Sequence, residues 1–198
     1  FVPSEREIEP ALERVFNTAS QKLIVACFAS HVHRVQQVLD LAVRHGRKVV
    51  YVGRSMVRNM AIARDLGYLK VPENTLVELK DVEHLPDDKV VIISTGSQGE
   101  PMSALGLMAR GENKWLKLGE HDTVVLSSHA IPGNESNVNA VIDGLIRTGA
   151  DVVHPGILDV HATGQKLYVE LAGNVPTVVN IDRVDKAAGG GLKVRDYK

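Results

Sequence analysis

Apolar and polar positions alternate along the chain in two different rhythms. Five short apolar runs have the length of buried strands, at 23–28, 48–52, 90–94, 123–127 and 151–153. Five longer segments repeat apolar residues every three or four positions, at 5–18, 32–44, 55–66, 101–109 and 134–147. The continuous runs predict strands buried on both faces, and the longer spacing predicts amphipathic helices. The alternation therefore predicts an α/β fold, a doubly wound and mostly parallel sheet of about five strands flanked by helices.

Local sequence signals predict two of the helix starts, and the alternation of strands and helices stops before the C-terminus. Ser4 followed by Glu7 has the spacing of a capping box, which predicts a helix from residue 5 onward. Pro101 suits the first turn of a helix, because an N–H has no partner there. Beyond residue 164 the rhythm ends, so we expect an α/β domain over 1–164 and a tail of uncertain structure over 165–198. A glycine-rich stretch within this tail, at 187–191, is typical of a flexible linker.

Charge is unevenly distributed along the chain. The net charge of −1 favours no class of partner by itself. Residues 31–70 nevertheless contain eight basic residues against two acidic ones, Asp40 and Asp65. The basic residues are Arg34, Arg44, Arg47, Lys48, Arg54, Arg58, Arg64 and Lys70. Such an excess is compatible with a phosphate-rich partner, although solvated helix faces often have the same composition.

Cysteine usage and hydropathy narrow the cellular setting. The chain has one cysteine, Cys27, which excludes an internal disulfide. It lies within an apolar run, which favours a buried thiol over a reactive nucleophile. No apolar run approaches the roughly 20 residues that cross a bilayer, and the first residues lack the pattern of a secretory signal. We therefore expect a cytoplasmic protein with no membrane partner.

Small polar residues follow every predicted strand. Ser30 follows the first strand, Arg54 the second, and the stretch STGSQGEP at 94–101, which includes Ser97, closes the third. Ser127–His129 and His154 follow the last two strands. Open parallel sheets bind ligands at this edge, and hydroxyls, backbone N–H groups and a guanidinium suit an anion. The alternative is that each is a turn and a helix cap. Neither the Walker spacing nor the GxGxxG spacing is present.

The histidines do not assemble a metal site in the sequence. His31 and His33 have the HxH spacing of hydrolytic metal centres, but no Asp-His pair follows them. On a helix these two side chains would point about 200° apart. Zinc needs three or four ligands, and no second histidine follows His161 within its turn. A GxSxG nucleophile motif is also absent from the sequence. We therefore expect no bound metal and assign no catalytic residue.

Several long strings together resemble one known family. They are FASHVHRVQQV, GRKVVYVGRSM, DLGYLKVPENTLVEL, STGSQGEPMSAL, DTVVLSSHAIPGNE and VHATG, in this order within residues 1–164. They resemble the β-CASP domain of bacterial ribonuclease J. The resemblance implies a domain inserted within a metallo-β-lactamase domain. It also implies zinc ions between the two domains, 5′–3′ exonuclease and endonuclease activity on RNA, and a homo-oligomer. The expected ligand is RNA, preferably 5′-monophosphorylated.

The resemblance also implies roles for particular residues. His161, Ala162, Thr163 and Gly164 correspond to a loop of the HxSG type that holds an RNA phosphate, with Thr163 in place of the serine. Ser97 and Ser30 correspond to walls of the same channel. The family has a second histidine where this chain has Gln165, and its HxHxDH metal motif is absent from the 198 residues. We therefore expect an RNA-binding portion that is inactive alone and binds no zinc itself.

The sequence is also compatible with two other functions. The same crevice suits a stand-alone α/β enzyme, or binding module, for a small phosphorylated metabolite. The domain is also compatible with a purely structural module that makes subunit contacts.

Overall fold

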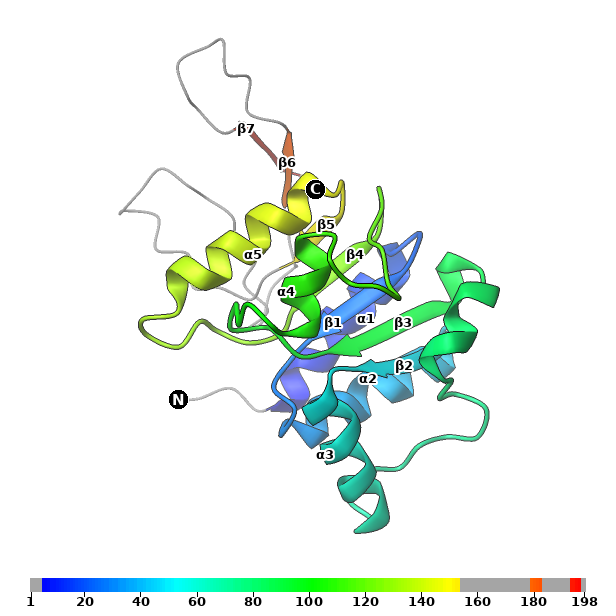
Figure 1. The fold of residues 1–198 in the computed structure, drawn as a ribbon. Coiled ribbons are helices and arrows are strands. Elements are labelled where there is room, and N and C mark those ends of the chain that lie inside the picture. Colours follow the sequence, from blue (N-terminus) through cyan, green and yellow to red (C-terminus); the bar gives the residue numbers. More distant parts are fainter. Residues whose placement is uncertain (1–4, 154–178, 183–192, 197–198) are drawn as a thin grey trace.

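The core of the protein is a five-stranded sheet in which all neighbouring strands run parallel (Figure 1). The computed structural model describes residues 5–153, 179–182 and 193–196. The strands are β1 (Leu23–Ala26), β2 (Lys48–Val52), β3 (Val90–Ser94), β4 (Thr123–Leu126) and β5 (Asp151–Val153), in the order β2-β3-β1-β4-β5. The predicted α/β fold with a parallel sheet of about five strands is confirmed.

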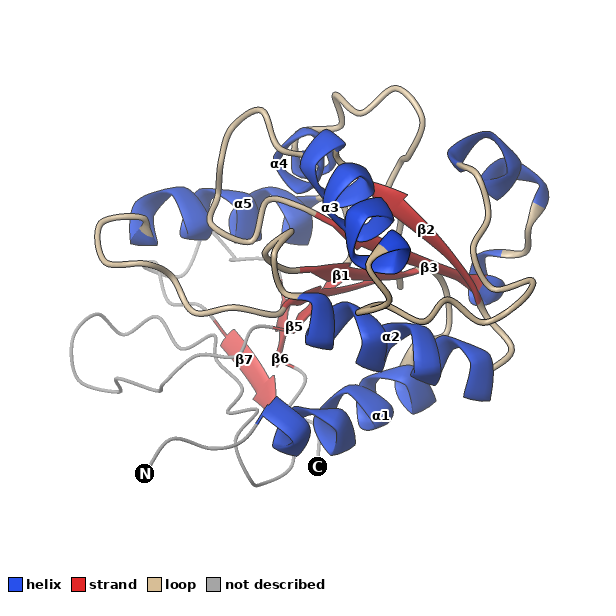
Figure 2. Ribbon diagram, turned by 90° about the horizontal axis from the view of Figure 1, so that it is seen from below, coloured by secondary structure: helices blue, strands red, loops and turns tan. Residues whose placement is uncertain are grey.

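Helices cover both faces of this sheet. They are α1 (Glu9–Thr18), α2 (Val32–Arg44), α3 (Arg54–Asp65), α4 (Ala104–Ala109) and α5 (Glu135–Arg147). Figure 2 shows α1 and α2 on one face and α4 and α5 on the other. Three short 3₁₀ helices, Glu5–Ile8, Leu79–His84 and Asp87–Lys89, complete the described helical elements. Within residues 5–153, no helix has the length and apolar character that a membrane crossing requires.

Side chains of the central strands enter two separate apolar cores. Leu23 and Val25 of β1 pack with α1, α2 and α3, whereas Ile24 and Ala26 pack with α4 and α5. All four of these residues are 0% exposed. Successive strand residues point to opposite faces, so a strand covered on both sides must be apolar at every position. The continuous apolar runs of the sequence have this cause.

Two helices start later than the sequence predicts. Residues Glu5–Ile8 form a 3₁₀ turn, and α1 begins at Glu9 with Pro10 in its first turn. A helix from residue 5 would require an N–H at Pro10, which proline lacks. Similarly, Pro101 lies in a turn before α4, and Ser103 is the N-cap, whose Oγ accepts a hydrogen bond from the Gly106 N–H at 3.1 Å. A serine hydroxyl accepts from one of the free N–H groups that open a helix, and Pro101 has no side-chain acceptor.

The described part of the tail contains an antiparallel strand pair. Strand β6 (Val179–Asp182) pairs with β7 (Lys193–Asp196). The expected linker at 187–191 and the proposed boundary at residue 164 lie outside the described residues. The division of the chain at that boundary therefore stays a prediction.

The loop after β3 makes a close backbone contact with α5. Gly99 has a φ of +74°, and a Cβ built on it would lie 2.3 Å from the carbonyl carbon of Asn137. A backbone atom cannot move aside as the end of a flexible side chain can. Gly99 therefore lets the loop lie against the first turns of α5.

Replacing Gly99 with alanine should destabilise the fold by more than backbone strain alone. The control is Gly111→Ala, because Gly111 has a similar φ of +71° with nothing within 4 Å of a built Cβ. We expect the control to lower the free energy of unfolding by about 1–2 kcal/mol, and Gly99→Ala by about 1–3 kcal/mol more. Urea denaturation of both variants measures the difference. Equal losses would show that the contact with α5 does not constrain this loop.

Candidate functional site

The loops that follow β1, β2, β3 and β4 meet at one edge of the sheet. Backbone hydrogen bonds continue past the strand ends: the Cys27 N–H donates to the Ser94 carbonyl at 3.1 Å, and the Ser127 N–H donates to the Ala26 carbonyl at 2.7 Å. The Thr95 N–H likewise donates to the Val52 carbonyl at 3.3 Å. The predicted convergence is present for these four strands. His154, which follows β5, lies outside the described residues.

Ser30 and Arg54 are the predicted site residues that reach solvent at this edge. Ser30 ends the turn after β1, and Arg54 begins α3 directly after β2; both are exposed. They line different surface pockets: Ser30 lines one of about 410 Å³, whereas Arg54 lines one of about 630 Å³ between β2, α3 and residues 76–79. The edge therefore offers a hydroxyl and a guanidinium at two separate hollows.

The loop at 94–101 is more closely packed than its composition suggests. Ser97 is 2% exposed, and Gly96, Gln98 and Gly99 around it are also buried. The turn at Gly96, whose φ is +113°, lies directly against Ser103 and Leu105. Much of this stretch therefore shapes the edge from within. The role of Ser97 as a phosphate contact remains a prediction.

Gln98 links the β3 loop to the β4 loop and was not singled out from the sequence. Its Nε2 donates to Ser128 Oγ at 3.0 Å and to the His129 carbonyl at 2.7 Å, and its Oε1 accepts from the Ile131 N–H at 2.8 Å. The side chain is 4% exposed. In the sequence, the only indication of this role is a long amide side chain among glycines and serines, in a stretch without helical periodicity. Gln98 holds the two loops in a fixed relative position.

Arg34 is buried and binds the end of β4 at this edge. Its Nε donates to Glu5 Oε1 at 2.6 Å and its Nη2 to Glu5 Oε2 at 3.1 Å. Its Nη1 donates to the Ser127 carbonyl at 3.0 Å and also contacts Ser127 Oγ. A buried guanidinium needs this full set of partners. Arg34 therefore fixes the end of β4 and adds no free charge to the surface.

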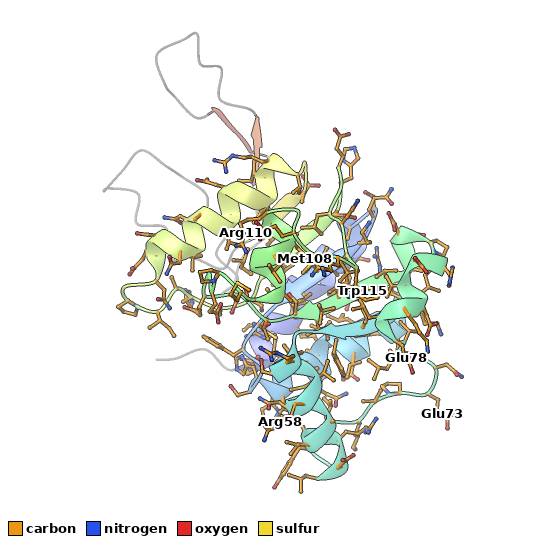
Figure 3. The ribbon with its side chains drawn as sticks, viewed as in Figure 1. Arg58, Glu73, Glu78, Met108, Arg110 and Trp115 are labelled. Atoms are coloured by element: carbon orange, nitrogen blue, oxygen red, sulfur yellow. The ribbon has the colours of Figure 1, made fainter. Side chains whose placement is uncertain are left out.

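Other basic residues of segment 31–70 also have partners inside the chain. Arg44 pairs with Glu9 and Glu13, and Arg47 donates to the backbone carbonyls of Ala19 and Gln21. Within the described residues Arg54, Arg58 and Lys70 form no ion pair. Figure 3 shows Arg58 on α3, well separated from Arg110 at the end of α4. The accessible positive charge is therefore concentrated on fewer residues than the sequence suggests.

The described residues do not fit a zinc centre. They contain no group of three or more His, Cys, Asp or Glu side chains that could hold a metal ion. His31 has a carboxylate nearby, with its Nε2 3.8 Å from Glu5 Oε2, but that carboxylate already pairs with Arg34. His161, Ala162, Thr163, Gly164 and Gln165 lie outside the described residues, so their predicted contact with phosphate stays a prediction.

Cys27 is a core residue, as its sequence context indicates. It is 1% exposed and free. Burial raises the pKa of the Cys27 thiol to about 12, an effect that the nearby Arg34 opposes and Glu5 reinforces. The thiol is therefore neutral at physiological pH and unsuited to nucleophilic attack.

Alkylation should distinguish this buried thiol from a reactive one. A pKa of about 12 in place of 9.0 leaves about a thousandfold less thiolate at pH 8. We expect iodoacetamide to label Cys27 slowly in the folded chain and rapidly in urea, as measured by mass spectrometry. Between pH 9 and 12 only the unfolded chain ionises this thiol, so stability should fall with rising pH there. Labelling at equal rates in both states would contradict the burial.

Exchanging the Gln98 amide for a carboxylate should destabilise the edge. In Gln98→Glu the hydrogen bond to the His129 carbonyl is replaced by oxygen–oxygen repulsion in a buried position, although the Ser128 hydroxyl can turn and donate to the carboxylate. We expect a loss of about 1–3 kcal/mol or more in unfolding free energy. The control is Gln21→Glu, since the Gln21 side chain is half-buried and makes no hydrogen bond within residues 5–153. Urea denaturation measures both. Equal, small losses would show that the Gln98 link is dispensable.

Comparisons with known proteins place the chain in a family. Residues 20–145 match the family described as "Ribonuclease J, beta-CASP domain". Ribonuclease J of Mycolicibacterium smegmatis is 52% identical over 169 residues, which cover 85% of this chain and 30% of that protein. Ribonuclease J of Corynebacterium glutamicum is 45% identical over 168 residues, covering 85% and 23%. The chain thus spans less than a third of the length of these relatives. It belongs to the ribonuclease J family, of which it carries the β-CASP domain.

Proposed function

We propose that the chain is the RNA-binding portion of a ribonuclease J, which contacts RNA phosphates along the edge where its parallel strands end. The observation that carries this proposal is the exposure of Ser30 and Arg54 at that edge, beside Arg58, which has no ion pair within residues 5–153. Hydroxyls and guanidinium groups are the side chains that bind phosphate oxygens. The family membership supports RNA over other phosphate ligands.

Further contacts are proposed from the family resemblance. His161, Ala162, Thr163, Gly164 and Gln165 would continue the phosphate path beyond β5. Ser97 would contribute through the shape of its loop, since its own side chain is buried.

The nuclease chemistry is proposed to belong to the longer protein. The HxHxDH motif that would hold zinc is absent from the 198 residues, and hydrolysis at neutral pH needs a metal-activated water or an equivalent. We propose that the full-length protein uses zinc, degrades 5′-monophosphorylated RNA as a 5′–3′ exonuclease and endonuclease in the cytoplasm, and forms a homo-oligomer. The part described here supplies binding and positioning.

The salt dependence of RNA binding tests the phosphate contacts. For a labelled, single-stranded, 5′-monophosphorylated RNA, the affinity of the 198-residue chain should fall steeply with salt, by about 0.7 in the log–log slope for each phosphate neutralised. Arg54→Ala with Arg58→Ala should reduce that slope by about 1.4, for two lost contacts. The control is Arg110→Ala, because Arg110 is also exposed but lies at the end of α4 (Figure 3), where it pairs with Glu112 at 2.9 Å. Fluorescence anisotropy measures all three.

An affinity that does not change with salt would contradict the proposal. If Arg110→Ala reduced the salt slope as much as the double variant, RNA would bind to positive charge in general and not along a defined surface. Thermal stabilisation by sugar phosphates or nucleotides, with none by RNA, would favour the small phosphorylated metabolite instead.

A further inference from the structure

A pocket of about 410 Å³ opens beside Ser30, and apart from Ser30 none of its lining residues has been placed on the phosphate path. It lies between the start of α2 and the C-terminal half of α3. Its volume is within the range of about 300–1,000 Å³ that holds small ligands. Ser30, His31, His33 and Asn59 supply its polar groups. Its remaining lining is apolar or aromatic: Val32, Ile62, Ala63, Leu66 and Tyr68.

Tyr68 stands at this pocket with its side chain unusually exposed. The residue is 76% exposed, and its neighbours at the pocket, Leu66 and Ile62, are 66% and 47% exposed. An aromatic ring this accessible contributes little to the core. It is available to pack against a flat partner.

The backbone that carries Tyr68 is firmly held. Its N–H donates to the Ala63 carbonyl at 2.8 Å, and the Gly67 N–H donates to the Arg64 carbonyl at 2.9 Å, with a Gly67 φ of +77°. These two bonds and the left-handed glycine form a Schellman motif that ends α3. The turn places Tyr68 beside Ala63, which also lines the pocket. An ordered turn thus presents an exposed ring at a defined place.

The two walls of the pocket are also tied together. Asn59 Nδ2 on α3 donates to the Ala29 carbonyl at 3.1 Å, next to Ser30 in the turn after β1. The pocket is therefore built against the residue that we place on the phosphate path. Every residue of its lining belongs to 30–68, almost all of it within the basic segment 31–70. Arg58 precedes Asn59 and forms no ion pair in the described part of the chain.

We propose that this pocket takes one unpaired nucleobase of the bound RNA, which stacks on Tyr68 while Ser30 and Arg58 hold the adjoining phosphates. The inference rests on the proposed function and adds a base contact to it. An aromatic surface within a positive groove is the arrangement by which proteins bind single-stranded nucleic acid. An apolar side chain of a protein partner would fill the hollow but would leave the polar groups of the lining, such as the Ser30 hydroxyl and the Asn59 amide, without a counterpart.

Abasic RNA combined with a Tyr68 variant tests the stack. The probe is a short 5′-monophosphorylated single-stranded RNA and a set of copies that each lack one base. With the unmodified chain, removal of the base at one position should weaken binding about five- to a hundredfold, the range for loss of one base–aromatic stack. Tyr68→Ala should weaken binding of intact RNA equally. The affinity of the Tyr68→Ala variant should not depend on whether the base at that position is present. Tyr68→Phe should bind both RNAs as the unmodified chain does.

The control for a general loss of aromatic surface is Trp115→Ala. Trp115 is 72% exposed and lies away from α3, over the face that α4 covers (Figure 3). It should leave RNA binding and its abasic profile unchanged. The melting temperature of Tyr68→Ala should also stay unchanged, since its ring is not part of a core.

The outcomes separate this inference from the proposed function. The unmodified chain could bind RNA with the expected salt dependence while Tyr68→Ala binds every oligonucleotide with the same affinity as the unmodified chain. The proposed base pocket would then be wrong, and the proposed phosphate path would stand. If Tyr68→Ala weakens all oligonucleotides equally, with no position losing its sensitivity, the ring is not a stacking site. If the unmodified chain binds no RNA, both proposals fail.

Discussion

The central position of β1 is the constraint on which the rest of the structure depends. Each of its residues pairs in parallel with β3 on one side and with β4 on the other, so that Leu23 lies opposite both Val91 and Thr123. Since the three strands run in the same direction, the loops that follow them must leave at one edge. A slip of one residue would exchange the side chains between the two apolar cores. The register that fills both cores therefore also determines which loops meet.

Polar groups at that edge are divided between holding the edge together and facing solvent. Gln98 and Arg34 use nearly all of their donors on neighbouring loops, and both are almost fully buried. Buried polar networks with every partner present make a structure rigid. A rigid edge loses little conformational freedom when a ligand binds, which favours affinity. The groups left for a ligand, Ser30 and Arg54, are presented by this frame and do not take part in it.

An exposed arginine that forms no ion pair within residues 5–153 and an exposed aromatic ring lie on α3 or at its end. Arg58 and Tyr68 lie on this helix or on the turn that ends it, whereas Arg34 and Arg44, on α2, are neutralised by carboxylates of the N-terminal segment. Counting charges along the sequence therefore overstates the positive surface. The chain covers less than a third of its relatives' length.

The sequence by itself determined the fold class, the order of the elements and the burial of Cys27. A strand covered on both faces has to be apolar throughout, and this requirement is visible in the chain without any partner. It did not determine where α1 and α4 start, because Pro10 and Ser103 act through backbone hydrogen bonds that composition does not reveal. Ser97 and Gln98 show the same limit within the candidate site. Both are buried polar residues of one loop that packs against segments about 30 to 40 positions away: Gln98 bonds to Ser128, and Gly99 lies against Asn137. Only the packing of those segments decides which polar groups hold the edge and which remain open to a ligand.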